Sequence, residues 1–148
     1  MTDIAFYHLQ KLPLERALPK LLEKTLQAGK RALIIAGSSA RVEALNAALW
    51  TYDQNSWLPH GCARDGHAED QPIWITDGED NPNGATFLFL TDGCSGPATD
   101  FERCFDMFDG NDPSSVAAAR ERWKANKADG HNLAYWQQTE AGGWAQKA

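Results

Sequence analysis

Hydrophobic positions in the first third of the chain follow a strand, helix and strand pattern. Apolar residues at 3–9 predict a first strand, and leucines spaced three and four apart predict an amphipathic helix over 18–28 with Pro19 in its first turn. The uninterrupted apolar run at 32–36 predicts a strand that is buried on both faces. This order is typical of a βαβ unit, in which the two strands run parallel.

The remainder of the chain continues the same alternation. A helix is predicted at 40–50, strands at 72–76, 85–90 and 103–108, and a last edge strand or extended segment at 132–138. Residues 51–71 are polar and are predicted to form mainly a long surface loop. The pattern predicts a single α/β domain over residues 1–138, followed by a flexible tail at 139–148.

The clearest helix signal lies between Asp112 and Gly130. Asp112 is a suitable N-cap, Pro113 suits the first helical position, and Gly130 is a typical stop. Helical spacing places five residues on one broad face. They are Val116, Arg120, Trp123, Lys124 and Lys127.

Charge changes the interpretation of this helix. The protein has a net charge of −6, and residues 53–112 carry thirteen acidic and two basic residues. Residues 114–128 carry four basic residues and one acidic residue. Two interpretations stay open: a solvated charged face with Trp123 turned into the core, or a docking site for an anionic peptide.

Several other classes of function find little support in the sequence. The negative charge argues against general affinity for DNA or anionic lipid, and no segment approaches the roughly 20 apolar residues of a membrane span. The N-terminus shows no secretory signal, and the three cysteines indicate reduced thiols in a cytoplasmic protein. His60, Cys62 and His67 match no common metal-site spacing, so no metal is expected. His8 is interpreted as a structural histidine.

One enzymatic alternative remains from the residues alone. The loop at 37–39 could hold a phosphate, and Asp77 and Asp92 each follow a predicted strand, where ligands of α/β sheets bind. Against it, both aspartates stand in ordinary Asp-Gly turns, and Ser38 or Ser39 is a natural helix cap.

Six blocks of sequence together resemble the chi subunit family of bacterial DNA polymerase III. They are Ala5-Phe6-Tyr7, residues 29–34, residues 45–50 with 58–60, residues 105–110, residues 119–124 and residues 130–136. The resemblance implies a Rossmann-like fold with a mostly parallel central sheet, helices on both faces and no nucleotide chemistry. It implies a non-catalytic accessory subunit without cofactor.

The resemblance also implies partners and a site. Such proteins bind the acidic C-terminal tail of single-stranded DNA-binding protein, which ends in phenylalanine, and often a small subunit called psi or another clamp-loader component. The site would include Arg120, Trp123 and Lys124, with Val116 and Lys127 beside them and Trp50 and Trp57 as apolar walls. Val116 replaces a lysine of the best-known relatives, and Trp123 replaces a common tyrosine. Direct stacking of single-stranded DNA on the tryptophans is a further alternative.

Overall fold

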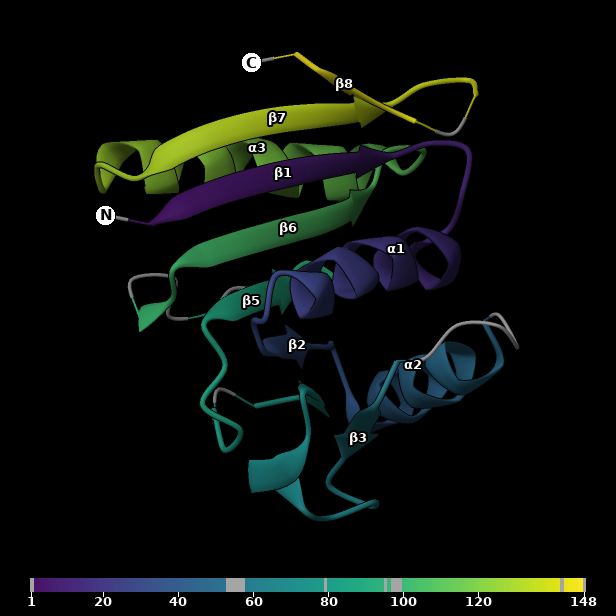
Figure 1. The fold of residues 1–148 in the computed structure, drawn as a ribbon. Helices are drawn as coiled ribbons and strands as arrows, with labels where there is room; N and C mark the ends of the chain where they lie inside the picture. The colour runs from purple at the N-terminus through teal and green to yellow at the C-terminus, as the bar shows by residue number, and fades with distance from the viewer. Residues whose placement is uncertain are drawn as a thin grey trace.

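A central β-sheet organises the molecule. The computed structural model describes residues 2–52, 58–78, 80–94, 96, 100–141 and 143–147. Within them the sheet has the strand order β3-β4-β2-β5-β6-β1-β7-β8 (Figure 1). All neighbouring strands run parallel except β7 and β8, which are antiparallel. The elements are β1 (Asp3–Leu9), α1 (Leu14–Gln27), β2 (Ala32–Ile35), α2 (Ser39–Thr51), β3 (His60–Cys62), the 3-10 helix η1 (Ala68–Asp70), β4 (Ile73–Thr76), β5 (Phe87–Leu90), β6 (Arg103–Asp109), α3 (Pro113–Ala128), β7 (Asn132–Gln138) and β8 (Trp144–Gln146).

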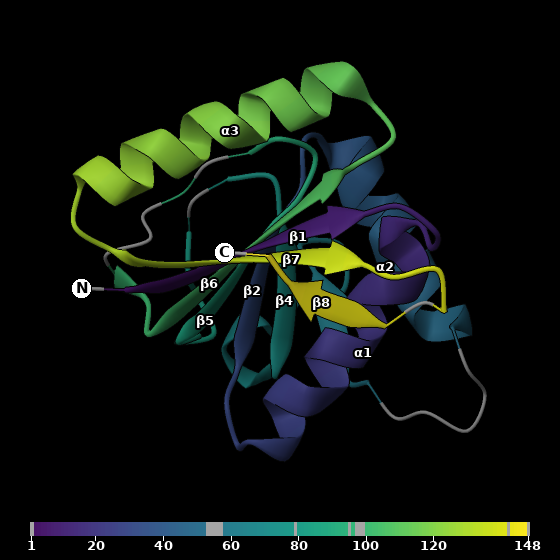
Figure 2. The ribbon, with the colours of Figure 1, turned by 90° about the horizontal axis from the view of Figure 1, so that it is seen from above.

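Helices cover both faces of this sheet. Figure 2 shows α3 on one side and α1 with α2 on the other. Because strand side chains alternate between faces, the core is divided in two. On the α1/α2 side the rings of Phe89 and Phe105 stack with their centroids 4.3 Å apart. On the α3 side the ring centroids of Phe6 and Trp123 lie 5.3 Å apart. The predicted Rossmann-like α/β architecture is confirmed.

The ends of the helices follow from their caps. The Ser38 hydroxyl accepts a hydrogen bond from the Arg41 N–H at 3.2 Å, and the Asp112 carboxylate accepts one from the Ser114 N–H at 3.1 Å. These caps start α2 and α3 within one residue of the predicted positions. Helix α1 starts at Leu14, so the predicted start at residue 18 is wrong and Pro19 lies inside the helix. The half-buried Leu14 extends the apolar stripe by one turn beyond the proline.

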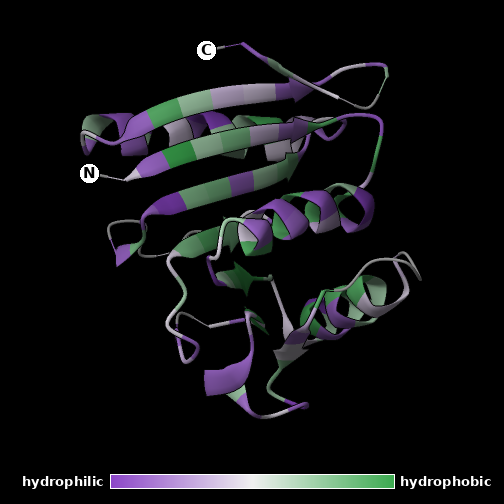
Figure 3. Ribbon diagram, in the orientation of Figure 1, coloured by the Kyte–Doolittle hydropathy of each residue, from purple (hydrophilic) through white to green (hydrophobic). Residues whose placement is uncertain are grey.

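The two three-residue strands, β3 and β8, were not predicted. Strand β3 and the 3-10 helix η1 interrupt the segment 51–71, which was expected to be mainly loop. His60 fixes β3, because its ring contacts the carbonyl oxygens of Leu58 at 2.6 Å and Asn46 at 3.0 Å. The central strands β2 and β5, in contrast, are hydrophobic along their length, as the sequence indicates (Figure 3).

Strand β8 lies within the segment predicted to be a flexible tail. The turn before it is closed by Thr139, whose N–H donates to the Gly143 carbonyl oxygen at 2.8 Å. The Trp144 ring meets the Tyr7 ring edge-on at 4.9 Å. This contact gives the short strand an apolar anchor, and β7 is therefore an inner strand instead of the predicted edge.

Candidate functional site

Trp123 faces the sheet from the middle of α3. Its ring makes edge contacts with Phe6 at 5.3 Å and Tyr135 at 6.0 Å, and its side chain is half-buried. Ala119, one turn earlier, is fully buried. Trp123 is therefore turned toward the core, yet part of its surface remains accessible on the flank of α3 beside β7.

The cations of α3 divide between its two flanks. Arg122 points to β6, where its Nε and Nη2 atoms donate to Asp106 at 2.6 and 3.0 Å. Arg120, Lys124 and Lys127 are exposed. Lys124 lies 3.5 Å from Glu121, with both side chains more than 70% exposed, so this pair contributes little stability. Within the described part of the chain, no carboxylate lies within ion-pair distance of Arg120 or Lys127.

Two residues from the sheet lie beneath this flank. The Tyr135 hydroxyl of β7 is 2.5 Å from Nδ1 of His8 on β1. Burial lowers the pKa of His8, and the charge of Arg120 lowers it further, while Gly110 and Asp109 oppose these effects. Burial raises the pKa of Tyr135, and Arg120 opposes that rise. The charge of Arg120 therefore acts on both side chains.

We call Val116, Arg120, Trp123, Lys124 and Lys127, together with Tyr135 and His8, the α3 flank. Val116 is half-buried and packs with the α3-side core. The five helix residues were predicted from helical spacing, whereas Tyr135 was not singled out and His8 was interpreted as a structural histidine. Their contact depends on the pairing of β1 with β7, which places Phe6 opposite Tyr135 across more than 120 residues of sequence.

The two predicted aromatic walls do not join this flank. Trp50 lies on α2, which covers the opposite face of the sheet (Figure 2), and its ring packs on His60 at 4.2 Å. Trp50 is 54% exposed. Trp57 lies outside the described residues. The structure thus separates Trp50 from Arg120, Trp123 and Lys124.

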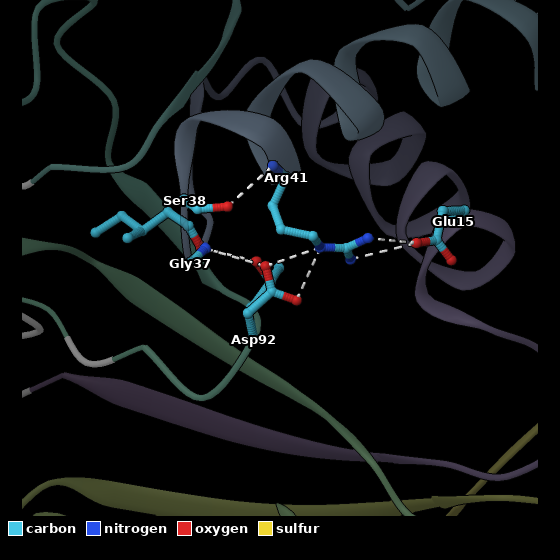
Figure 4. Close-up of polar contacts among 7 residues, drawn as sticks. Glu15, Gly37, Ser38, Arg41 and Asp92 are labelled. Atoms are coloured by element: carbon cyan, nitrogen blue, oxygen red, sulfur yellow. Dashed lines mark hydrogen bonds and ion pairs between the residues drawn. The ribbon is translucent and has the colours of Figure 1, made fainter.

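Within the enzymatic alternative, Asp92 and the loop at 37–39 are engaged in structural contacts. Figure 4 shows Asp92 accepting from the Gly37 N–H at 3.0 Å and from Arg41 Nε at 3.1 Å. Arg41 also reaches Glu15 at 3.3 Å. Asp77 follows β4, and β2 separates that strand from β5, so Asp77 and Asp92 lie about two strand spacings (~10 Å) apart.

A pocket of about 830 Å³ lies beside these contacts at the carboxyl ends of the strands. Its lining includes Arg41, Asp92 and Arg122, each of which already has an internal ion-pair partner. Three carboxylates and three cations line it: Glu15, Asp92, Asp109, Lys11, Arg41 and Arg122. The pocket therefore has no excess charge that would select an anionic ligand.

His60, Cys62 and Cys104 are buried in the fold, whereas His67 is exposed. His60 is held by two carbonyl oxygens, and Cys62 Sγ lies 3.4 Å from Asp65. Burial raises the pKa of the Cys104 thiol to about 12, which makes it a poor nucleophile. In the described ranges, no group of three or more potential metal ligands converges. No helix among these residues has the length and apolar content needed to cross a membrane.

Comparison with known proteins gives one family match. Residues 1–134 match the family model of the DNA polymerase III chi subunit, HolC. A curated relative, the probable DNA polymerase III subunit chi of Rickettsia prowazekii (strain Madrid E), is 33% identical over 90 residues. These residues make up 61% of this chain and 54% of that protein, so the match spans about half the length of the relative.

Comparison with solved structures informs the fold. The crystal structure of T4 UvsW superposes with a TM-score of 0.58 at 11% sequence identity. The superposition covers 92% of this chain and 41% of that one. At this identity the similarity describes the α/β architecture alone.

Proposed function

Because this chain belongs to the DNA polymerase III chi subunit family, we propose that it is a non-catalytic replication adaptor. In this proposal the α3 flank binds the acidic C-terminal tail of single-stranded DNA-binding protein. A second surface contacts the clamp loader, through psi where that subunit is present. The protein thereby connects the polymerase to coated single-stranded DNA in the cytoplasm.

The observation that supports this proposal is the free cationic flank of α3 on an acidic body. Arg120 and Lys127 have no ion-pair partner within the described part of the chain, and the half-buried Trp123 ring lies beside them. An acidic peptide with a terminal aromatic residue offers carboxylates for the cations and apolar area for the indole.

The strength of charge-assisted hydrogen bonds at an exposed surface leads us to expect moderate affinity for the peptide. Hydrogen bonds to charged groups contribute about 1.5–3 kcal/mol each, and solvent screening of exposed pairs reduces this gain. We therefore expect a dissociation constant in the micromolar range, equivalent to about −8 kcal/mol.

The structure also supports a role without catalysis. Asp92, one of the two strand-end carboxylates of the enzymatic alternative, is held by Arg41 and Gly37. These contacts stabilise the fold and leave Asp92 poorly suited to act as a base or a metal ligand.

The first prediction concerns Arg120. Titration of a fluorescently labelled acidic peptide ending in phenylalanine is expected to give binding at least about tenfold weaker for Arg120→Ala than for wild type, because a charge-assisted contact is lost. Lys20→Ala is the matched control, since Lys20 is an exposed cation on α1 across the sheet. We expect Trp50→Ala to bind like wild type. Unchanged affinity for Arg120→Ala would contradict the proposed site.

A further inference from the structure

Arg120, Tyr135 and His8 lie together in an arrangement that extends the function proposed above, and the inference drawn from it rests on that function. The three side chains come from α3, β7 and β1, and the fold brings them to the same flank. We propose that the Tyr135 hydroxyl, supported by His8, completes a carboxylate-binding site with Arg120, and that this site binds its carboxylate more tightly as the pH falls.

The hydrogen bond between His8 and Tyr135 determines whether the Tyr135 hydroxyl can donate to a ligand. His8 Nδ1 lies 2.5 Å from the Tyr135 hydroxyl, and His8 Nε2 lies 3.4 Å from Gln10 Nε2. When His8 is protonated, both ring nitrogens carry a proton and Nδ1 donates to the Tyr135 oxygen, and the backbone hydrogen bond with Gly110 favours this charged form. The Tyr135 hydroxyl proton is then available to donate to a ligand oxygen on the Arg120 side.

The His8 ring is fixed in this place by its neighbours. A Cβ atom at residue 110 would overlap the His8 ring, so the imidazole packs directly on the Gly110 backbone. The ring also lies 5.2 Å from the Phe108 ring and 5.9 Å from the Tyr135 ring. These contacts hold His8 behind Tyr135, away from direct contact with a ligand, so we regard it as a positioning residue.

Two charged side chains act on His8. On the neighbouring elements, Arg120 of α3 and Asp109 of β6 act on it with opposite signs, and Tyr135 of β7 is neutral. Burial and Arg120 hold the pKa of His8 below its ordinary value in the free protein. A carboxylate bound at Arg120 would offset that cation and favour the imidazolium form.

The sign of the pH effect follows from this difference. His8 has a higher pKa with the carboxylate bound than without it, so binding takes up a proton. Affinity then rises as the pH falls through the pKa of the bound state, and the gain is complete below the lower pKa of the free state. Because burial and Arg120 lower the pKa of His8 in the free protein, the tightening is expected on the acidic side of neutrality.

The experiment is a titration of the labelled acidic peptide at constant ionic strength between pH 5.5 and 8. Wild type is expected to bind about threefold to tenfold more tightly at pH 5.5 than at pH 8. His8→Gln should abolish this dependence, because glutamine can still donate to Tyr135 but does not titrate. Tyr135→Phe should weaken binding about threefold or more at every pH.

Two controls show which histidine causes the pH dependence and which carboxylate of the peptide is bound. His131→Gln replaces a half-buried histidine that follows α3 and should keep the full pH dependence. A peptide with a C-terminal amide shows which carboxylate is bound. Loss of the pH dependence with the amide assigns the site to the terminal carboxylate, and its persistence assigns it to an aspartate side chain.

A direct measurement on wild type avoids dependence on the variants. NMR titration of the His8 imidazole should give a higher pKa with saturating peptide than without it. An unchanged pKa, or a pH dependence that survives in His8→Gln, would overturn this inference. Those results leave the adaptor function intact if Arg120→Ala still weakens binding, whereas a wild-type protein that does not bind the peptide at any pH would overturn both.

Discussion

The basic residues of α3 perform two different tasks. Arg122 is largely buried and holds the carboxylate of Asp106 with two hydrogen bonds, at 2.6 and 3.0 Å. Burial raises the pKa of Asp106, and the contacts from Arg122 oppose that rise. Lys124 pairs with Glu121 in solvent. One helix therefore carries a structural cation on one flank and available cations on the other.

A second prediction separates these tasks by stability. Arg122→Met leaves the Asp106 carboxylate buried without its partner, which is expected to cost about 3–5 kcal/mol in the free energy of unfolding. Lys124→Ala is the matched control and should change that free energy by no more than about 0.5 kcal/mol. Urea denaturation measures both. A loss below about 1 kcal/mol for Arg122→Met would show that Asp106 is relieved by protonation or by water.

At the scale of elements, the C-terminal end of β7 fixes the connection between β1 and α1. The side-chain oxygen of Gln138 accepts from the backbone N–H groups of Gln10, Lys11 and Leu12, at 3.1, 2.7 and 2.9 Å. Gln138 is itself buried. A single amide oxygen thus determines how the chain leaves β1 and enters α1.

The third prediction tests this connection. Gln138→Leu removes the acceptor of three amides, and because unsatisfied donors cost about 1–3 kcal/mol each when buried, we expect a total loss of at least about 2 kcal/mol. Hydrogen exchange at Gln10, Lys11 and Leu12 should accelerate in the same variant. Gln137→Ala, on the other face of β7, serves as the control. Unchanged exchange at the three amides would contradict this role of Gln138.

The elements differ in how far their sequences predict them. Helix α3 and strands β1 and β6 were predicted within one or two residues, because caps and apolar runs mark them locally. Strands β3 and β8 have three residues each, too few to show a period, and they depend on contacts such as that of Trp144 with Tyr7.

The candidate site shows the same division. Arg120, Trp123 and Lys124 share a flank because the helical period places them there. Whether α2 lies on the same face of the sheet as α3 is a property of the topology, so the position of Trp50 could not be predicted from its sequence neighbourhood. The contact between His8 and Tyr135 depends equally on long-range strand pairing.

At the scale of the whole molecule, charge is segregated. The protein has a net charge of −6, yet Arg120, Lys124 and Lys127 are exposed along one side of α3. An acidic body repels nucleic acid in general, while a local cationic surface attracts a short acidic peptide. Selectivity for a peptide over DNA is the expected consequence.

A fourth prediction follows from this segregation. Raising the salt concentration from about 50 to 300 mM should weaken binding of the acidic peptide severalfold, because exposed charge pairs are screened over roughly 10 Å or less. Single-stranded DNA should show no retention in filter binding at low salt. Salt-independent peptide binding would indicate an apolar interface, and tight DNA binding would favour stacking on the tryptophans.

The aspartate at the end of β5 has a consequence for the evolution of new ligands at this sheet. Asp92 supplies, from within the chain, the negative charge that a cofactor phosphate brings to the first turn of a helix in many related architectures. A side chain at residue 37 would crowd it, since a Cβ there would lie 3.0 Å from the Asp92 Cβ. A nucleotide binding here would have to displace the Asp92 carboxylate from Gly37 and from Arg41. The polar groups of Gly37, Arg41 and Asp92 already satisfy one another. Ligand recognition is therefore left to the outer surfaces of the helices.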